Sequence, residues 1–250
     1  MSGHSKWAQI KRQKGATDAR RGQLFTKLTR EIIVAARQGG SNPESNFRLR
    51  LAVQKARDSN MPLDNIDRAI KKGSGVAESG SLTELTLEGY GPNGVAIMVE
   101  AVTDNRNRTI ADVRSVFTKH GGNLGESGCV SWLFESRGVI VVDTKGIDAD
   151  ELALFAIDAG ADDVKIEKGY LEVFTNPQNL EIVRKNLERK STIESAEVSL
   201  VPSSTVMVDE QGAIKVLKLV DHLDELDDVQ RVFSNVDYSE SVMEKLKAQV

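Results

Sequence analysis

The hydrophobic pattern of this 250-residue chain changes its period at about residue 82, and this change limits what the chain can fold into. Before that point, apolar residues recur every three to four positions, as in amphipathic helices. After it, alternating and continuous apolar stretches are interleaved with helical ones, which is typical of mixed α/β structure. The sequence therefore predicts a multidomain α+β chain that begins with a helical domain.

Three short amphipathic helices are predicted in the first part, and together they form a small bundle. They cover residues 17–38, residues 46–60, and a third stretch from residue 62 or 64 to residue 72. The residues expected to be buried in the second and third helices are Phe47, Leu51, Val53, Ala56, Leu63, Ile66 and Ile70. Gly39-Gly40 ends the first helix.

The second part contains two predicted α/β domains. Residues 138–201 have the order strand, helix, strand, strand, helix, strand, which is the ferredoxin-like βαββαβ order. Before it come a strand pair within residues 82–102, a helix at 107–120 and a strand at 129–134; after it come strands near 205–208 and 232–236, a helix at 213–226 and a terminal helix. The predicted domains are therefore residues 1–79, a discontinuous domain of 80–135 and 203–250, and an inserted domain of 136–202.

Charge is unevenly distributed along the chain. Residues 1–75 carry a net charge of +10 and the remaining 175 residues carry −14, so the overall −4 hides a strong asymmetry. A basic segment of this kind indicates a polyanionic partner. We therefore expect the first domain to bind nucleic acid through phosphates, with the acidic remainder either repelling phosphates or docking against the basic domain and masking it.

The candidate nucleic-acid-binding residues lie in the first 30 positions. They are Lys6, Trp7, Lys11, Arg12, Lys14, Arg20, Arg21, Lys27 and Arg30. Lysine and arginine neutralise phosphates and release counterions, while an indole can stack on an unpaired base. Trp7 has the alternative role of covering the helical bundle. The pattern supports no reading of base sequence.

A second arginine pair lies between a predicted strand and a predicted helix, in the stretch from Asp104 to Thr109. Arg106 and Arg108 are candidates for a second anion contact near the start of that helix. The alternatives are a clamp that docks two domains and a capped turn with solvated arginines. The sequence leaves these three alternatives open.

Enzyme classes find little support in the sequence, and we expect no catalytic residues, no metal and no cofactor. Gly89 to Gly94 match a dinucleotide-binding pattern but precede a strand instead of a helix, so they predict a hairpin. His4, His120 and His222 are far apart in the sequence, and the single cysteine, Cys129, lies in an apolar stretch. A metal-dependent nuclease would have to use Glu100, Asp104 and Asp112. The sequence contains no signal peptide or membrane span, which favours a cytoplasmic protein.

Five segments carry a resemblance to the YebC/PmpR family, whose mitochondrial relatives include the translational activator of cytochrome c oxidase. The segments read GHSKWAQIKRQKGATDARRGQLFTKLTREI, NMPLDNIDRAIKKGSG, GYGPNGVAIMVEAVTDNRNRT, KHGGNLGESGCVSWLFE and KVLKLVDHLDELDDVQRVFSNVD. Phe47 stands where proline is expected, and Cys129 where serine is commoner. The resemblance implies a helical N-terminal domain, two α/β domains with one ferredoxin-like and inserted in the other, and a role linked to nucleic acid without established catalysis.

Family members act as DNA-binding transcriptional regulators, while others act on translation at the ribosome. The function expected from the resemblance and the charge pattern is a non-enzymatic regulator of gene expression that binds DNA. The alternatives are an RNA-binding or ribosome-associated translation factor, and a small-ligand sensor acting through the ferredoxin-like domain. The oligomeric state does not follow from the sequence.

Overall fold

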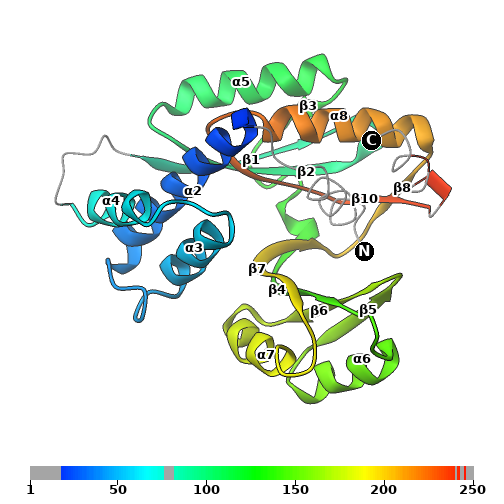
Figure 1. Ribbon diagram of the computed structural model, residues 1–250. Helices are drawn as coiled ribbons and strands as arrows, with labels where there is room; N and C mark the ends of the chain where they lie inside the picture. Colours follow the sequence, from blue (N-terminus) through cyan, green and yellow to red (C-terminus); the bar gives the residue numbers. More distant parts are fainter. Residues whose placement is uncertain (1–17, 76–81, 240, 243–244, 246–250) are drawn as a thin grey trace. The chain divides into compact units, whose positions relative to one another are not determined.

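The computed structural model describes residues 18–75, 82–239, 241–242 and 245 of the chain, with only the backbone described for residues 18–20. These residues form two compact units (Figure 1). One unit is Leu133–Ser204, and the other combines the described residues up to Trp132 with those from Thr205 onward. The finer division into three domains with the bounds expected above stays a prediction.

Three helices make up the N-terminal part: α2 (Asp18–Gly39), α3 (Phe47–Asp58) and α4 (Leu63–Gly73). Their shared core includes Leu28, Ile32, Ala36, Leu49, Ala56 and Ile66. Gly73 lets α4 approach α2 closely, because a Cβ on this residue would lie 2.5 Å from the carbonyl oxygen of Ile33. The predicted three-helix architecture is therefore confirmed.

The faces of two helices differ from the prediction. Asn46 is the N-cap of α3, where its side chain accepts a hydrogen bond from the N–H of Leu49. This start places Leu49, Ala52, Val53 and Ala56 on the buried face, whereas Phe47 and Leu51 are only half-buried. Leu63 is 61% exposed, since it is the first residue of α4. The expected burial of Leu63 was therefore wrong, and Phe47, Leu51 and Ile70 are only half-buried.

A four-stranded sheet in the order β3-β1-β2-β9 forms the centre of the same unit. Its strands are β1 (Thr83–Tyr90), β2 (Ala96–Thr103), β3 (Asn123–Leu124) and β9 (Val229–Ser234). Helices α5 (Arg106–Lys119) and α8 (Glu210–Asp224) lie side by side over one face of this sheet (Figure 1). Strands β8 (Val206–Val208) and β10 (Val236–Tyr238) pair in parallel beside it.

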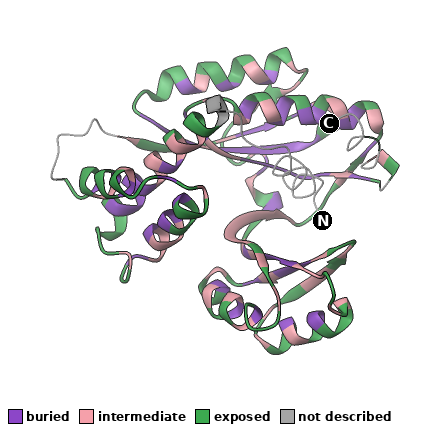
Figure 2. Ribbon diagram, in the orientation of Figure 1, coloured by how far each residue is buried: buried purple, intermediate pink, exposed green. Residues whose placement is uncertain are grey.

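The core of this part lies between the sheet and the two helices. It contains Ile97, Val99, Val113, Phe117, Leu219 and Leu223 among other buried apolar residues. Strand β2 is buried at every residue except Glu100, as Figure 2 shows by its colour. The Gly89–Gly94 segment makes the predicted hairpin between β1 and β2, with Asn93 at φ 62° and Gly94 at φ 73° in its turn.

The strand predicted at residues 129–134 is wrong. A short 3-10 turn, Ser131–Leu133, occupies this place, and strand β4 begins only at Phe134. The physical reason is Glu88, whose buried carboxylate accepts hydrogen bonds from the N–H groups of Gly128, Val130 and Ser131. Because these donors are already used, the segment cannot form a strand ladder through them.

The unit Leu133–Ser204 has the predicted βαββαβ order of elements. They are β4 (Phe134–Asp143), α6 (Ala149–Asp158), β5 (Asp163–Glu167), β6 (Tyr170–Thr175), α7 (Leu180–Leu187) and β7 (Ile193–Pro202). The four strands form an antiparallel sheet in the order β5-β6-β4-β7. Its core contains Ile140, Leu152, Leu171, Leu180 and Leu187.

The two ends of this unit are tied to each other. Phe134 pairs with Pro202 in the β4–β7 ladder, and the backbone N–H and hydroxyl of Ser203 both donate to the carbonyl of Leu133. The chain therefore enters and leaves the unit at adjacent positions.

Candidate nucleic-acid interface

The basic tail lies outside the described residues. This applies to Lys6, Trp7, Lys11, Arg12 and Lys14. Arg20 lies in α2, and only its backbone is described. The described candidates on α2 are Arg21, Lys27 and Arg30, so the interface is built here from these three and from cations on α3 and α4.

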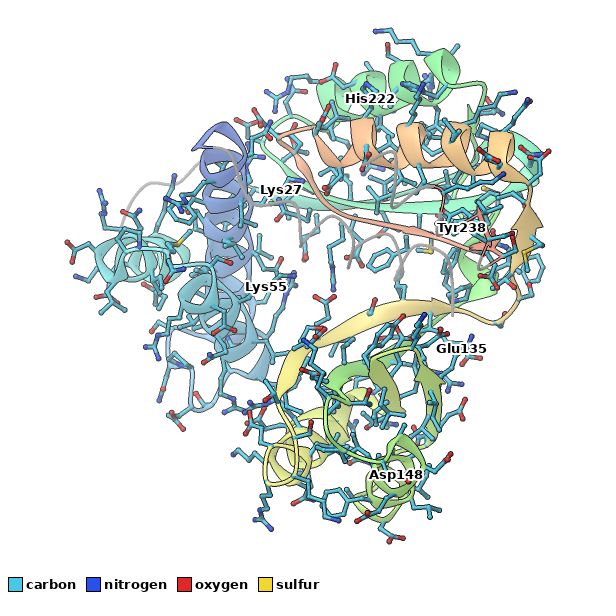
Figure 3. The ribbon with its side chains drawn as sticks, turned by 45° about the vertical axis from the view of Figure 1, so that its right-hand side comes forward. Lys27, Lys55, Glu135, Asp148, His222 and Tyr238 are labelled. Atoms are coloured by element: carbon cyan, nitrogen blue, oxygen red, sulfur yellow. The ribbon has the colours of Figure 1, made fainter. Side chains whose placement is uncertain are left out.

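Lys27 is held by the end of α8. Its ammonium donates to the Asp224 side chain at 3.0 Å and to the backbone carbonyl of the same residue. Gln23, one turn earlier on α2, donates to the carbonyl of Glu225. Lys27 lies on α2 and is labelled in Figure 3. The acidic C-terminal end of α8 and the residue after it thus contact Gln23 and Lys27 of α2 directly.

Arg30 is held by the same turn. Its guanidinium forms an ion pair with Asp228 at 3.1 Å and donates to the backbone carbonyl of Asp227. The side chains of Lys27 and Arg30 are 14% and 22% exposed, so both are largely withdrawn from solvent. Two of the predicted phosphate contacts are therefore neutralised inside the molecule.

Asp228 is the centre of a buried polar network. While one carboxylate oxygen pairs with Arg30, the other accepts from Arg108 at 2.8 Å, Thr109 at 2.7 Å and Thr103 at 3.1 Å. Burial alone would raise the pKa of Asp228, but these hydrogen bonds and the charge of Arg30 outweigh burial and lower the pKa below its ordinary value. The carboxylate therefore stays ionised at neutral pH.

Arg106 and Arg108, the second arginine pair, differ in their surroundings. Arg108 bonds both Asp228 and Asp104, and its N–H donates to the side chain of Asn105, which caps α5. Through Asp228 it is linked to Arg30 on α2, which is the geometry of the clamp considered above. Arg106 is exposed and forms no ion pair among the residues that the structure describes.

Other cations of the helical part are also paired. Arg48 on α3 contacts Glu31 at 2.8 Å and Glu84 at 2.6 Å. Arg50 donates to the carbonyls of Pro43 and Glu44. These arginines hold the bundle and its junction with β1, and the sequence contained no signal that distinguished them from binding residues.

A set of exposed cations remains on the described part of the helical region. Arg21 on α2, Arg57 on α3, and Lys71 and Lys72 on α4 are exposed, and none of them forms an ion pair within residues 21–75 or 82–239. Lys71 and Lys72 lie in the last turn of α4, where they also complement the helix dipole. These four residues are among the accessible positive charges of the described helical part, where Arg37, Lys55 and Arg68 are exposed as well.

The sequence did not predict a close pair of histidines. The rings of His120 and His222, which are far apart in the chain, have their centroids 4.5 Å from each other. Burial lowers the pKa of His120, and the charges of His222, Lys218 and Lys119 lower it further. His222 lies on α8 (Figure 3). Their chain separation of about a hundred residues left no local signal.

The described residues include no convergent acidic cluster of the kind that a metal-dependent nuclease would need. Glu100 pairs with Arg231 at 2.8 Å and Asp104 pairs with Arg108 at 2.9 Å. Within the described residues, no three histidine, cysteine or acidic side chains are grouped so as to hold a metal ion. The described helices also include none that is long and apolar enough to span a membrane.

Comparisons with known proteins place the whole chain in one family. Residues 5–76 match the model of the TACO1/YebC protein N-terminal domain, and residues 82–236 match that of the TACO1/YebC second and third domain. A probable transcriptional regulatory protein of Dehalococcoides mccartyi (strain CBDB1) is 60% identical over 250 residues, which is 100% of both chains. Another from Natranaerobius thermophilus is 51% identical over 98% of this chain and 99% of its own length.

A solved structure supports the same assignment. The crystal structure of a conserved hypothetical protein from Aquifex aeolicus is 53% identical, covers 89% of this chain and 93% of its own, and superposes with a TM-score of 0.81. The relatives are described as transcriptional regulators and not as enzymes, as the sequence predicted. On these grounds the chain belongs to the TACO1/YebC family.

Proposed function

We propose that this protein regulates gene expression by binding nucleic acid through the phosphates, with its basic N-terminal helical domain as the contact surface. The observation that carries the proposal is the net charge of +10 in residues 1–75, together with Arg21, Arg57, Lys71 and Lys72 exposed on the described helices. Cations in this density attract a phosphate backbone and release its counterions. The names of the relatives favour DNA as the target.

The proposed contact has two layers. The tail residues Lys6, Lys11, Arg12 and Lys14, with Arg20 and Arg21, make the first phosphate contacts, and Trp7 stacks on an unpaired base where one is available. Lys27 and Arg30 form the second layer of contacts, because phosphates reach them only by displacing Asp224 and Asp228. Arg106 adds a second anion contact, whereas Arg108 serves the clamp.

Domain roles follow from this division. We assign binding to residues 1–79, the acidic clamp to the discontinuous domain of 80–135 and 203–250, and a separate module to the ferredoxin-like residues 136–202. The alternative function is an RNA-binding factor acting on translation, because ribosomal and messenger RNA present the same phosphates. Relative affinity for RNA and DNA separates the two.

The test measures binding by fluorescence anisotropy of labelled duplex DNA and single-stranded RNA over a range of salt concentrations. The logarithm of affinity should fall linearly with the logarithm of salt, by about 0.9 per phosphate for the duplex and about 0.7 for the single strand. A triple variant, Lys11→Ala, Arg12→Ala and Arg21→Ala, should bind more weakly with a smaller salt slope. RNA bound more tightly than DNA at equal salt would favour the translation alternative.

A matched control removes three exposed cations from the other unit: Lys145→Ala, Lys168→Ala and Arg189→Ala. Both triple variants change the net charge equally, so only a contact surface in the helical domain makes them differ. Equal affinities of the two variants, or binding that does not depend on salt, would overturn the proposal.

A further inference from the structure

Trp132 is the most exposed of the large hydrophobic side chains that the structure describes, at 71%. Its indole N–H donates to the carbonyl oxygen of Cys129 at 3.2 Å. The hydroxyl of Tyr90, itself 41% exposed, donates to the same carbonyl at 3.0 Å. The polar groups of both aromatic residues are thus satisfied inside the protein, and what they offer to solvent is apolar ring surface.

The turn that carries Trp132 is rigidly built. Glu88 is 5% exposed, and its carboxylate accepts three backbone hydrogen bonds, each of 2.8 Å, from Gly128, Val130 and Ser131. Gly125 packs so closely that a Cβ there would lie 2.6 Å from the Cys129 sulfur. An exposed tryptophan on a fixed turn loses little freedom when a partner binds, which is the property of an anchor residue.

Two acidic residues, Glu88 and Glu126, lie at this turn close to Cys129. Burial raises the pKa of the Cys129 thiol, and the charges of Glu88 and Glu126 raise it further. The 175 residues that follow residue 75 carry a net charge of −14. Negative charge beside aromatic rings favours a cation and disfavours a phosphate strand.

We propose that Tyr90 and Trp132, with Glu126 in the turn that holds Cys129, bind an arginine side chain of a basic polypeptide partner. A guanidinium is planar and weakly hydrated, so it stacks on aromatic rings better than a lysine ammonium does. This surface is distinct from the basic domain and does not depend on the proposed binding of nucleic acid. The molecule then has two partners of opposite charge.

The experiment uses the full-length chain with Trp7→Phe, which leaves Trp132 as its only tryptophan. The probe is a labelled peptide of eight arginines spaced by glycine and serine, with a lysine peptide of the same design for comparison. Trp132 emission should change saturably, with the same midpoint as the anisotropy of the arginine peptide. The lysine peptide should bind more weakly.

Variants identify the contact. Trp132→Ala and Glu126→Gln should each weaken arginine-peptide binding about threefold or more, as expected for a cation–π contact and a nearby charge. Asp158→Asn is the matched control: it removes one exposed acidic charge in the other unit and should leave affinity unchanged. Circular dichroism verifies that each variant is folded.

Three results would overturn the proposal: Trp132 emission that does not respond to the peptide, equal affinities of Trp132→Ala and Asp158→Asn, or a single-stranded oligonucleotide that changes Trp132 emission at lower concentration than the peptide. The oligonucleotide affinity of Trp132→Ala is measured in parallel and should equal that of the parent. Absence of nucleic-acid binding in the chain that keeps Trp7 would overturn the function proposed above while leaving this surface intact.

Discussion

Two buried carboxylates in the same unit are satisfied in opposite ways. Glu88 receives its hydrogen bonds from backbone N–H groups of a single turn, whereas Asp228 receives them from side chains on α2, α5 and the end of β2. The first carboxylate fixes the shape of a loop. The second joins separate segments and takes Arg30 out of contact with solvent. A buried carboxylate can therefore fix the shape of a loop or withdraw a cation from solvent, depending on which groups donate hydrogen bonds to it.

Glu88→Ala should cause the largest change. It leaves three N–H groups without their acceptor, and the free energy of unfolding should fall by about 3 kcal/mol. Urea denaturation measures the loss. Glu126→Ala is the control, since its exposed carboxylate should change stability by less than about 0.5 kcal/mol. Similar losses in the two variants would contradict the role given to Glu88.

Asp228→Asn should cost less, about 1–2 kcal/mol, because the amide oxygen still accepts hydrogen bonds on one side, although its NH2 group cannot accept and the charge that Arg30 and Arg108 pair with is lost. Hydrogen exchange should increase in α2 and in the first turn of α5. Unchanged exchange in α2 would contradict the joining role of Asp228.

Acid should weaken both sites together. The pKa values of Glu88 and Asp228 are lowered in the folded state, so their contribution to stability is complete above the unfolded-state values of about 4 and is lost as pH falls through the folded values. Unfolding followed from pH 7 to pH 3 should show this loss. The double variant Glu88→Gln with Asp228→Asn should have a flatter profile, and a profile parallel to that of the parent would speak against the assignment.

Two neighbouring acidic residues, Asp224 and Asp227, allow a test of whether pairing with Asp224 keeps Lys27 from contacting DNA. Asp224→Asn removes the carboxylate charge paired with Lys27 and leaves only neutral acceptors there, so binding to duplex DNA should tighten about threefold at 0.15 M salt, with a slightly steeper salt slope. Asp227→Asn removes the same charge, but the exposed Asp227 carboxylate forms no ion pair within the described residues. Equal gains from both variants would mean that general repulsion, and not release of Lys27, limits binding.

The smallest expected effect concerns the histidine pair. His222→Gln removes one of the charges that lower the pKa of His120, so the pKa of His120 should rise toward its ordinary value. NMR titration of the imidazole proton measures the shift. Lys215→Gln, on the exposed face of α8 at a position not named among the causes, should leave the pKa of His120 unchanged.

Local patterns predicted the element types well, because helix and strand periodicity depend on neighbouring residues. The hairpin at Gly89–Gly94 and the βαββαβ order are examples. The strand wrongly predicted at 129–134 failed for a non-local reason: its backbone donors are used by Glu88, which lies some 40 residues earlier and looked like a solvent-facing polar residue of an alternating strand.

The site was less predictable than the fold. Net charge identified the basic region, but Lys27 and Arg30 find their acidic partners 197 residues or more away, and such distances leave no trace in spacing. Charge patterns thus predict which segment is basic, and only the fold tells which of its cations are already engaged.

The joined ends of residues 133–204 have a consequence for the history of such chains. Because the first and last residues of this unit are adjacent, the chain on either side of it has to be joined across only a short distance. Exchange of the unit, or a change in its size, therefore does not require a new path for the rest of the chain.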